Sequence, residues 1–258
     1  MLERLELDEP PITPNIIMED LGLGLDTLPS FDLERLDLEQ LALFGSVKGL
    51  FSPSENKVYL SEDLARRQEQ WVIYHESAHA EITWHKELLY LDNEYTLGFA
   101  VRERMEKEAN AFAGHVQFLG PRFAAESREL PFGIASVCLL ADRYDASVES
   151  SLRRYVETCG EECVCGVLRI GRHADGRRET LTFRYFVKPI EKRTYWNFPW
   201  RVGQALPEDD ALVTLLNGGK LAGGEIYQET YYDSGSKTAY HREVFCNGQS
   251  VFVLTRQL

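Results

Sequence analysis

Residues 75 to 85 read HESAHAEITWH and contain an HExxH motif formed by His75, Glu76 and His79. In an α-helix, residues four positions apart lie on one face, so the two histidines can bind one metal ion. Glu76 would lie beside that ion, where a carboxylate can accept a proton from the water that attacks a peptide bond. The motif favours a metal-dependent peptidase, and surface histidines on a solvated helix are the alternative reading.

A catalytic zinc ion usually has three protein ligands, so the motif needs a third. His85 lies six residues after His79, the spacing of the third histidine in metzincin proteases. That pattern requires a glycine where this chain has Ile82, a β-branched residue that resists the sharp turn. In a continuous helix His85 points away from the ligand face. We therefore expect His85 to be a surface residue at the helix end.

Glu106, in the segment EKEANAF, is the other candidate and would approach the ion from a second helix. Two histidines and one glutamate are a known zinc ligand set. Asn110 follows Glu106 by one helical turn and can hydrogen-bond a ligand side chain. Glu108 and His115 lie on other sides of this helix, and we expect them to be surface or packing residues.

These patterns together predict a metal site made by His75, His79 and Glu106, with Glu76 as the catalytic base. Zinc is the expected ion, although manganese and iron also accept this ligand set. The sequence does not identify the group that stabilises the oxyanion; the candidates are Tyr74, Tyr95 and His115.

The composition describes a globular chain of 258 residues, with 44% hydrophobic residues, 27% charged residues and a net charge of −13. Such acidity argues against binding to phosphate backbones and suits a basic protein partner, if it is more than an aid to solubility. No apolar run approaches the length of a membrane span, and the first residues are not those of a secretory signal. The five cysteines are an odd number, as expected for reduced thiols. We expect a cytoplasmic location.

The chain before residue 158 is expected to be mainly helical. Its first thirty residues, rich in Pro and Gly, favour an extended arm. A hairpin is predicted at 41–61, around the turn FSPSEN. Helices are predicted at 61–85 and 101–118, the first including HExxH. Two short helices at 131–157 have a helix-turn-helix outline, but only Arg153 and Arg154 of the second could meet DNA, which favours packing over direct DNA binding.

After Cys159 the pattern becomes that of strands. CVCGVLRIG, TLTFRYFV, EIYQETYY, TAYHREVF and SVFVLT alternate in the manner of strands, and PEDDALVTLLNGG is typical of a short helix with a glycine stop. The expected fold class is α+β. The expected domains are a zincin-like metallopeptidase domain at 1–127, a helix-turn-helix-like helical segment at 128–158, and an α+β domain at 159–258. Cys159, Cys163 and Cys165 cluster at the last boundary without the spacing of a zinc knuckle, and their role is open.

HESAHAEITWH followed by EKEANAFAGHVQFLGP resembles the ImmA/IrrE family of metallopeptidases. GLFSPSENKVYLS resembles the strand pair that precedes the motif helix in that family, and ADRYDASVESSLRRY resembles its helix-turn-helix-like segment. The region after Cys159 is similar in strand order to the GAF-like domain of the radiation-response proteases. Two departures are Ala78, where the family commonly has glycine, and AGHVQFLGP, which is less apolar than the family's pattern.

The resemblance implies a cytoplasmic protease that cleaves a helix-turn-helix transcriptional repressor and so derepresses stress-response or mobile-element genes. It also implies that His75, His79 and Glu106 match the metal ligands and that Glu76 matches the catalytic base. A metal-binding sensor or transcription regulator without proteolytic activity is the alternative function. Retention of Glu76 speaks against a purely structural metal site, which needs no base.

Overall fold

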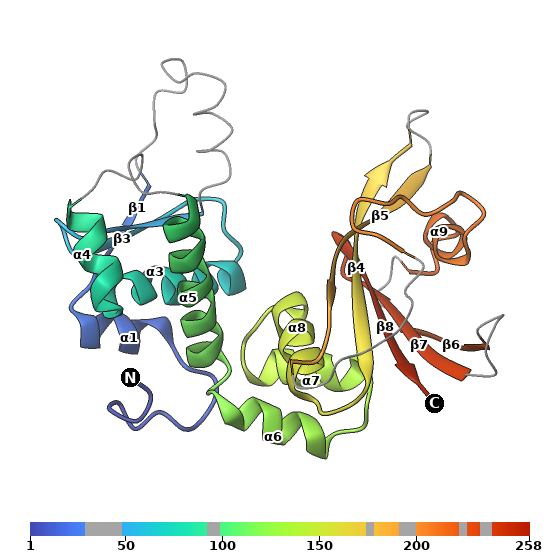
Figure 1. The fold of residues 1–258 in the computed structure, drawn as a ribbon, viewed down its shortest axis with the longest axis horizontal. Helices are drawn as coiled ribbons and strands as arrows, with labels where there is room; N and C mark the ends of the chain where they lie inside the picture. Colours follow the sequence, from blue (N-terminus) through green and yellow to red (C-terminus); the bar gives the residue numbers. More distant parts are fainter. Residues whose placement is uncertain (29–47, 92–98, 174–177, 191–199, 222–225, 233–238) are drawn as a thin grey trace. The chain divides into compact units, whose positions relative to one another are not determined.

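A computed structural model describes the protein at residues 1–28, 48–91, 99–173, 178–190, 200–221, 226–232 and 239–258 (Figure 1). These residues form two compact units: Met1–Gly120 with Arg143–Ser147, and Pro121–Asp142 with Val148–Leu258. Helices and two separate sheets make a mixed α+β fold, which confirms the expected class. Each unit has a hydrophobic core of its own.

The first unit contains a small sheet and the helices around it. The sheet has the order β1-β3-β2, with β1 parallel and β2 antiparallel to β3. The predicted hairpin is confirmed in β2 and β3, while residues 41–47 lie outside the described residues. The bounds are α1 Pro14–Leu21, β1 Gly24–Thr27, β2 Gly49–Ser52, β3 Lys57–Leu60, α3 Arg66–Glu81, α4 Thr83–Leu91 and α5 Phe99–Gln117.

The expectation of an extended arm over the first thirty residues is wrong for residues 14–27. Pro14 occupies the first turn of α1, where its missing N–H costs nothing, and Gly22 ends the helix in the left-handed conformation. Ile17 and Met18 are buried against the neighbouring core, so tertiary packing stabilises a helix too short to persist alone. The strand β1 then extends the expected hairpin to three strands.

The helix that carries HExxH is α3, the central helix of the first unit. Val72 and Ile73 bury one of its faces against the sheet and α1. On another side α3 packs against α5. The helix begins at Arg66 rather than near Ser61, and it ends at Glu81, where Ile82 takes an extended conformation with φ −76° and ψ 105°. The single helix predicted over 61–85 is therefore wrong, because the chain breaks at Ile82 and restarts as α4.

A short loop at residues 143–147 belongs to the first unit although the helices on both sides of it belong to the second. Asp145, with a positive φ of 49°, pairs with Arg66 and Arg67 and accepts a hydrogen bond from Gln70 at 2.9 Å. All three partners lie in the first turns of α3. These contacts fix the loop to the start of the HExxH helix.

The second unit is a five-stranded antiparallel sheet with helices packed against it. The sheet order is β5-β4-β8-β7-β6. The expected order of strand, strand, helix and three strands is confirmed, and α6 was not anticipated. The bounds are α6 Pro121–Glu129, α7 Ile134–Arg143, α8 Val148–Thr158, β4 Cys163–Arg172, β5 Glu179–Val187, α9 Ala211–Asn217, β6 Tyr227–Tyr232, β7 Ala239–Cys246 and β8 Ser250–Gln257.

Both faces of the large sheet are covered. Residues 163–168 of β4 are all buried, which requires packing on either side of the strand. The core that includes Leu168 and Val253 also includes Leu212 and Leu216 of α9. The helix α8 packs against β4 and β5. Of the helices in the 128–158 segment, α8 therefore packs on the sheet, and the first residue of α7 is hydrogen-bonded to Glu243 of β7. The domain boundaries expected at 127 and 158, and the GAF-like assignment, stay predictions.

Candidate metal centre

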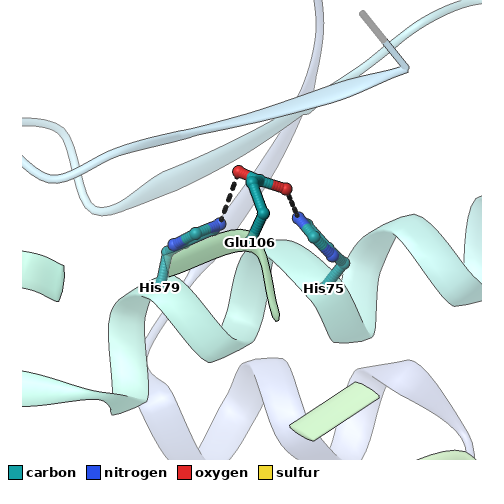
Figure 2. A group of neighbouring side chains, drawn as sticks. All are labelled: His75, His79 and Glu106. Atoms are coloured by element: carbon teal, nitrogen blue, oxygen red, sulfur yellow. Dashed lines mark ion pairs between the residues drawn. The ribbon is translucent and has the colours of Figure 1, made fainter. Parts of the chain in front are cut away.

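Three of the side chains singled out in the sequence converge on one point between α3 and α5 (Figure 2). His75 Nε2 lies 3.1 Å from Glu106 Oε2, and His79 Nε2 lies 3.8 Å from Glu106 Oε1. One ligand atom from each residue lies within 4.8 Å of the others. Bonds of about 2.1 Å to a tetrahedral ion hold ligand atoms roughly 3.4 Å apart, so the three residues fit a divalent metal.

The two helices present these ligands in the way that the sequence spacing requires. His75 and His79 are one turn apart on α3, with ring centroids 5.2 Å apart. Glu106 comes from the facing side of α5, which packs along α3. Two rigid helices therefore set the separation of the donors, because neither histidine nor Glu106 stands on a loop.

The electrostatics of the three residues suit a cation. Burial lowers the pKa of His79 to about 4, with the neighbouring His75 adding to the shift, so its imidazole is neutral at pH 7. A hydrogen bond with His75 lowers the pKa of Glu106 and keeps its carboxylate charged. Burial disfavours the charged form of His75, but the hydrogen bond to Glu106 and the charges of Glu76 and Glu106 outweigh it and raise that pKa.

Glu76 is buried beside the same helix face, with 8% of its surface exposed. Strand β2 passes close to it at Gly49. A Cβ at Gly49 would lie 3.3 Å from Glu76 Oε1 and 2.2 Å from Val72 Cγ1, a separation that atoms do not tolerate. Gly49 therefore lets the strand approach Glu76, a role that sequence reasoning missed. A glycine inside a strand is the signal that could have indicated it.

His85 is not at the surface, and the expectation that it would be is wrong. None of its surface is exposed, and its Nδ1 lies 3.1 Å from His79 Nδ1. The break at Ile82 turns the chain so that the first turn of α4 brings His85 back toward α3. His85 is outside the group of three that converges on one point, so the structure brings it against a candidate ligand and not among the ligands.

The remaining candidates occupy different surroundings. Asn110 hydrogen-bonds His75, as expected for a residue one turn after Glu106. The Tyr74 hydroxyl donates to the Ile12 carbonyl at 2.5 Å, which uses its proton away from the centre. His115 is exposed and lies against Gly120, and Tyr95 is outside the described residues.

Glu108, expected to be a surface or packing residue, is partly buried. Its carboxylate accepts hydrogen bonds from Trp84 Nε1 at 2.9 Å and from Arg104 Nε at 2.8 Å, and it lies 3.3 Å from His85 Nε2. The side chain thus links α4 to α5 immediately beside the candidate centre.

The cysteine cluster forms no comparable group among the described residues. All five cysteines are free thiols. The Sγ atoms of Cys159 and Cys163 lie 3.7 Å apart, and the hydrogen bond between them lowers the pKa of Cys159 to about 7. Cys165 is buried and donates to the Gly166 carbonyl. Across the described ranges, three or more His, Cys, Asp or Glu ligands converge only at the centre on α3 and α5.

Among the residues that the structure describes, no helix combines the length and the apolar character that crossing a membrane requires.

The chain is similar to known proteins in its fold and in part of its sequence. A Mycobacterium tuberculosis transcriptional regulator has a similar fold, with a TM-score of 0.59 and 12% sequence identity over 100% of this chain and 85% of the other. No curated protein matches the sequence. Residues 34–155, which include α3, α5 and every candidate ligand, match the IrrE N-terminal-like domain of peptidase family M78. This match supports the resemblance of residues 34–155 to the ImmA/IrrE family of metallopeptidases.

Proposed function

We propose that the protein is a metal-dependent endopeptidase that cleaves a helix-turn-helix transcriptional repressor and thereby derepresses stress-response or mobile-element genes. The observation that carries the proposal is the convergence of His75, His79 and Glu106 between α3 and α5, with the buried Glu76 next to His75 in the chain. The family match supports peptidase activity. The repressor substrate rests on the resemblance to ImmA/IrrE proteins, and a chromosome-bound substrate would place the enzyme in the cytoplasm.

His75, His79 and Glu106 would hold the ion, for which zinc is proposed and manganese or iron also suits the donors. When bound, such an ion supplies Lewis-acid polarisation of water and of the scissile carbonyl. Asn110 hydrogen-bonds His75 and holds its ring in place. The chain thus contributes a fixed cradle with an exposed side, because Glu106 keeps 55% of its side-chain surface in contact with solvent.

Glu76 would move the protons. A carboxylate in its position accepts a proton from the attacking water and returns it to the nitrogen of the leaving amine, which completes hydrolysis without a covalent intermediate. The neighbouring backbone of β2 gives a place for the substrate. Among the described residues β2 pairs only with β3, so an extended peptide could add to its other edge beside Glu76.

The test is cleavage of the helix-turn-helix regulators encoded in the same genome, followed on gels with zinc, with a chelator, and with zinc restored. We expect one regulator to be cut in a metal-dependent way. Glu76→Gln preserves shape but cannot accept the proton, so it should bind zinc like the parent and cleave at least about 100-fold more slowly. Parental cleavage by this variant would remove Glu76 from the mechanism.

The alternative function is a metal-binding sensor or transcription regulator without proteolysis. The observation that favours it is the similar fold of the Mycobacterium tuberculosis protein, which is described as a transcriptional regulator. The net charge of −13 opposes direct binding to DNA. A gel shift with promoter DNA, in the absence of any repressor, separates the two functions. A specific shift without cleavage of any regulator would favour the alternative.

A further inference from the structure

A second layer of side chains lies behind His79, on the side away from Glu106. His79 directs Nε2 toward Glu106 and places Nδ1 3.1 Å from His85 Nδ1. The two rings are 5.0 Å apart between centroids and inclined by 38°. On its far side His85 places Nε2 3.3 Å from Glu108 Oε2. His79, His85 and Glu108 therefore form a continuous row that begins at the candidate metal centre.

We propose that His85 and Glu108 are positioning residues that hold His79 in the tautomer able to bind the metal. The proposal rests on the proposed metal centre and adds to it two residues that the family match does not assign. It follows from the contacts among two imidazoles and one carboxylate, together with the rule that a neutral imidazole carries one N–H.

The proton positions along the row depend on one another. A histidine binds a metal through an unprotonated nitrogen, so Nε2 of His79 must lack a proton and Nδ1 must carry it. That N–H donates to Nδ1 of His85, which must then be the acceptor. The proton of His85 therefore sits on Nε2, where it faces the Glu108 carboxylate. The opposite arrangement puts a proton on His79 Nε2, toward Glu106, and blocks the ligand.

The surroundings of His85 indicate that its contact with Glu108 is a required polar interaction and not only close packing. His85 is fully buried, and its Nε2 makes no well-aligned hydrogen bond although Glu108 lies at 3.3 Å. An unsatisfied buried N–H costs about 1 to 3 kcal/mol, so the nearby carboxylate is the group to satisfy it. Trp84 Nε1 and Arg104 Nε hold that carboxylate in place. Metal-bound histidines commonly donate their second N–H to a carboxylate, here through an intervening ring.

The chain brings the row together by two local features. The extended conformation at Ile82 separates α3 from α4 and allows His85 to pack against His79. The Trp84 ring meets the His85 ring edge to face, with centroids 4.3 Å apart. Glu108 stands two residues after Glu106, so α5 provides one candidate ligand for the metal and one support for the opposite helix.

The test is zinc affinity, measured with a competing chelator on the full chain. His85→Phe fills the space but removes the acceptor, and we expect an affinity loss of about tenfold to a hundredfold. His85→Asn places an amide oxygen near the position of Nδ1 and should restore most of the affinity. Glu108→Gln should weaken binding, whereas Glu103→Gln, an exposed glutamate on the same helix that pairs with Lys107, should not. Equal affinities for the parent, His85→Phe and Glu108→Gln would overturn the proposal.

A second readout does not need the metal. Nitrogen-15 NMR of the histidine rings in the metal-free protein reports which nitrogen carries the proton. We expect His79 to be protonated at Nδ1 in the parent and to shift toward Nε2 in Glu108→Gln. His79 protonated at Nε2 in the parent would contradict the inference, even if the protein binds no zinc. Absence of any cleaved repressor would count against the proposed function alone, because neither measurement involves a substrate.

Discussion

Glu76 in the first unit and Glu243 in the second are about equally buried, with 8% and 4% of their surfaces exposed, yet their surroundings differ. Glu243 accepts hydrogen bonds from the Ile134 backbone N–H at 2.6 Å and from the Gln228 amide at 3.0 Å. It thereby joins the first turn of α7 to strand β7. Glu76 instead interacts electrostatically with the candidate ligand His75 and lies close to strand β2 at Gly49. Burial of a carboxylate therefore does not by itself identify a catalytic group, and its neighbours decide.

Each of these glutamates also lies against a glycine. A Cβ at Gly133 would be 2.8 Å from Glu243 Oε1, just as one at Gly49 would be 3.3 Å from Glu76 Oε1. The two glycines differ in conformation, because Gly133 has a φ of 153° and Gly49 needs no positive φ. The sequence alone does not distinguish the two glycine–glutamate pairs. Substitution has to test whether Gly133 and Glu243 stabilise the fold while Gly49 and Glu76 serve the candidate site.

The largest effect on stability is expected at Glu243. Glu243→Ala leaves the buried Ile134 N–H without its acceptor, which costs about 1 to 3 kcal/mol, and also removes the part-buried contacts of Glu243 with Gln228 and His241. We expect the free energy of unfolding in urea to fall by roughly 3 kcal/mol. Glu208→Ala, which breaks only exposed pairs with Arg178 and His173, is the control and should change little.

The contrast requires that Glu76 behave differently. Glu76→Gln should cost activity while the free energy of unfolding stays within about 1 kcal/mol of the parent, as is common for residues retained for chemistry. Equal destabilisation by Glu76→Gln and Glu243→Ala would show that both carboxylates are structural. The proposed difference between a structural Glu243 and a catalytic Glu76 would then be wrong.

The two glycines sharpen the comparison with a smaller effect. Gly133→Ala adds both a clash with Glu243 and a strained backbone, so we expect a loss of about 1 to 3 kcal/mol in unfolding free energy.

Gly49→Ala pushes β2 away from α3, chiefly through Val72, and should reduce peptidase activity as well as stability. Combining it with Val72→Ala removes the closest clash. If the double variant is no more active than Gly49→Ala alone, the close approach of β2 is not required for the activity of Glu76.

The sequence predicted those parts of the molecule that depend on local pattern. Alternation and turn signals indicated the strands and the short helix of the second unit, and the Asn247-Gly248 turn joined its last two strands. Helical spacing also predicted that His75, His79 and Glu106 would meet. The two histidines need only lie one turn apart on one helix, with Glu106 on a facing helix. These features require few contacts between distant residues.

The features that sequence reasoning missed depend on long-range packing. The helix α1 is stabilised by burial of Ile17 and Met18, which the Pro and Gly content of its segment obscured. His85 was expected to lie outward because a continuous helix was assumed through Ile82. The link from Glu243 to α7 spans 109 residues and leaves no local signal. Periodicity describes which face of an element is apolar, but it does not say where an element breaks.

The smallest expected effect concerns Asp145, whose contacts attach the 143–147 loop to α3 of the first unit. Hydrogen bonds from Arg66, and then from Gln70 and Arg67, lower the pKa of Asp145 despite partial burial. A lowered folded-state pKa means that the carboxylate stabilises the fold above its unfolded pKa of about 4, and that this stabilisation is lost as the pH falls through the folded value.

At neutral pH, Asp145→Asn should lower the melting temperature by about 2 to 4 °C, since Arg66 is largely exposed and its pair is screened. The difference from the parent should close below about pH 4, and calorimetry across that range measures it. Glu103→Gln, which breaks an exposed pair on α5, provides the matched control with little change at either pH. A difference that persisted unchanged at low pH would mean that the loop is held by packing of its neighbours and not by the Asp145 charge.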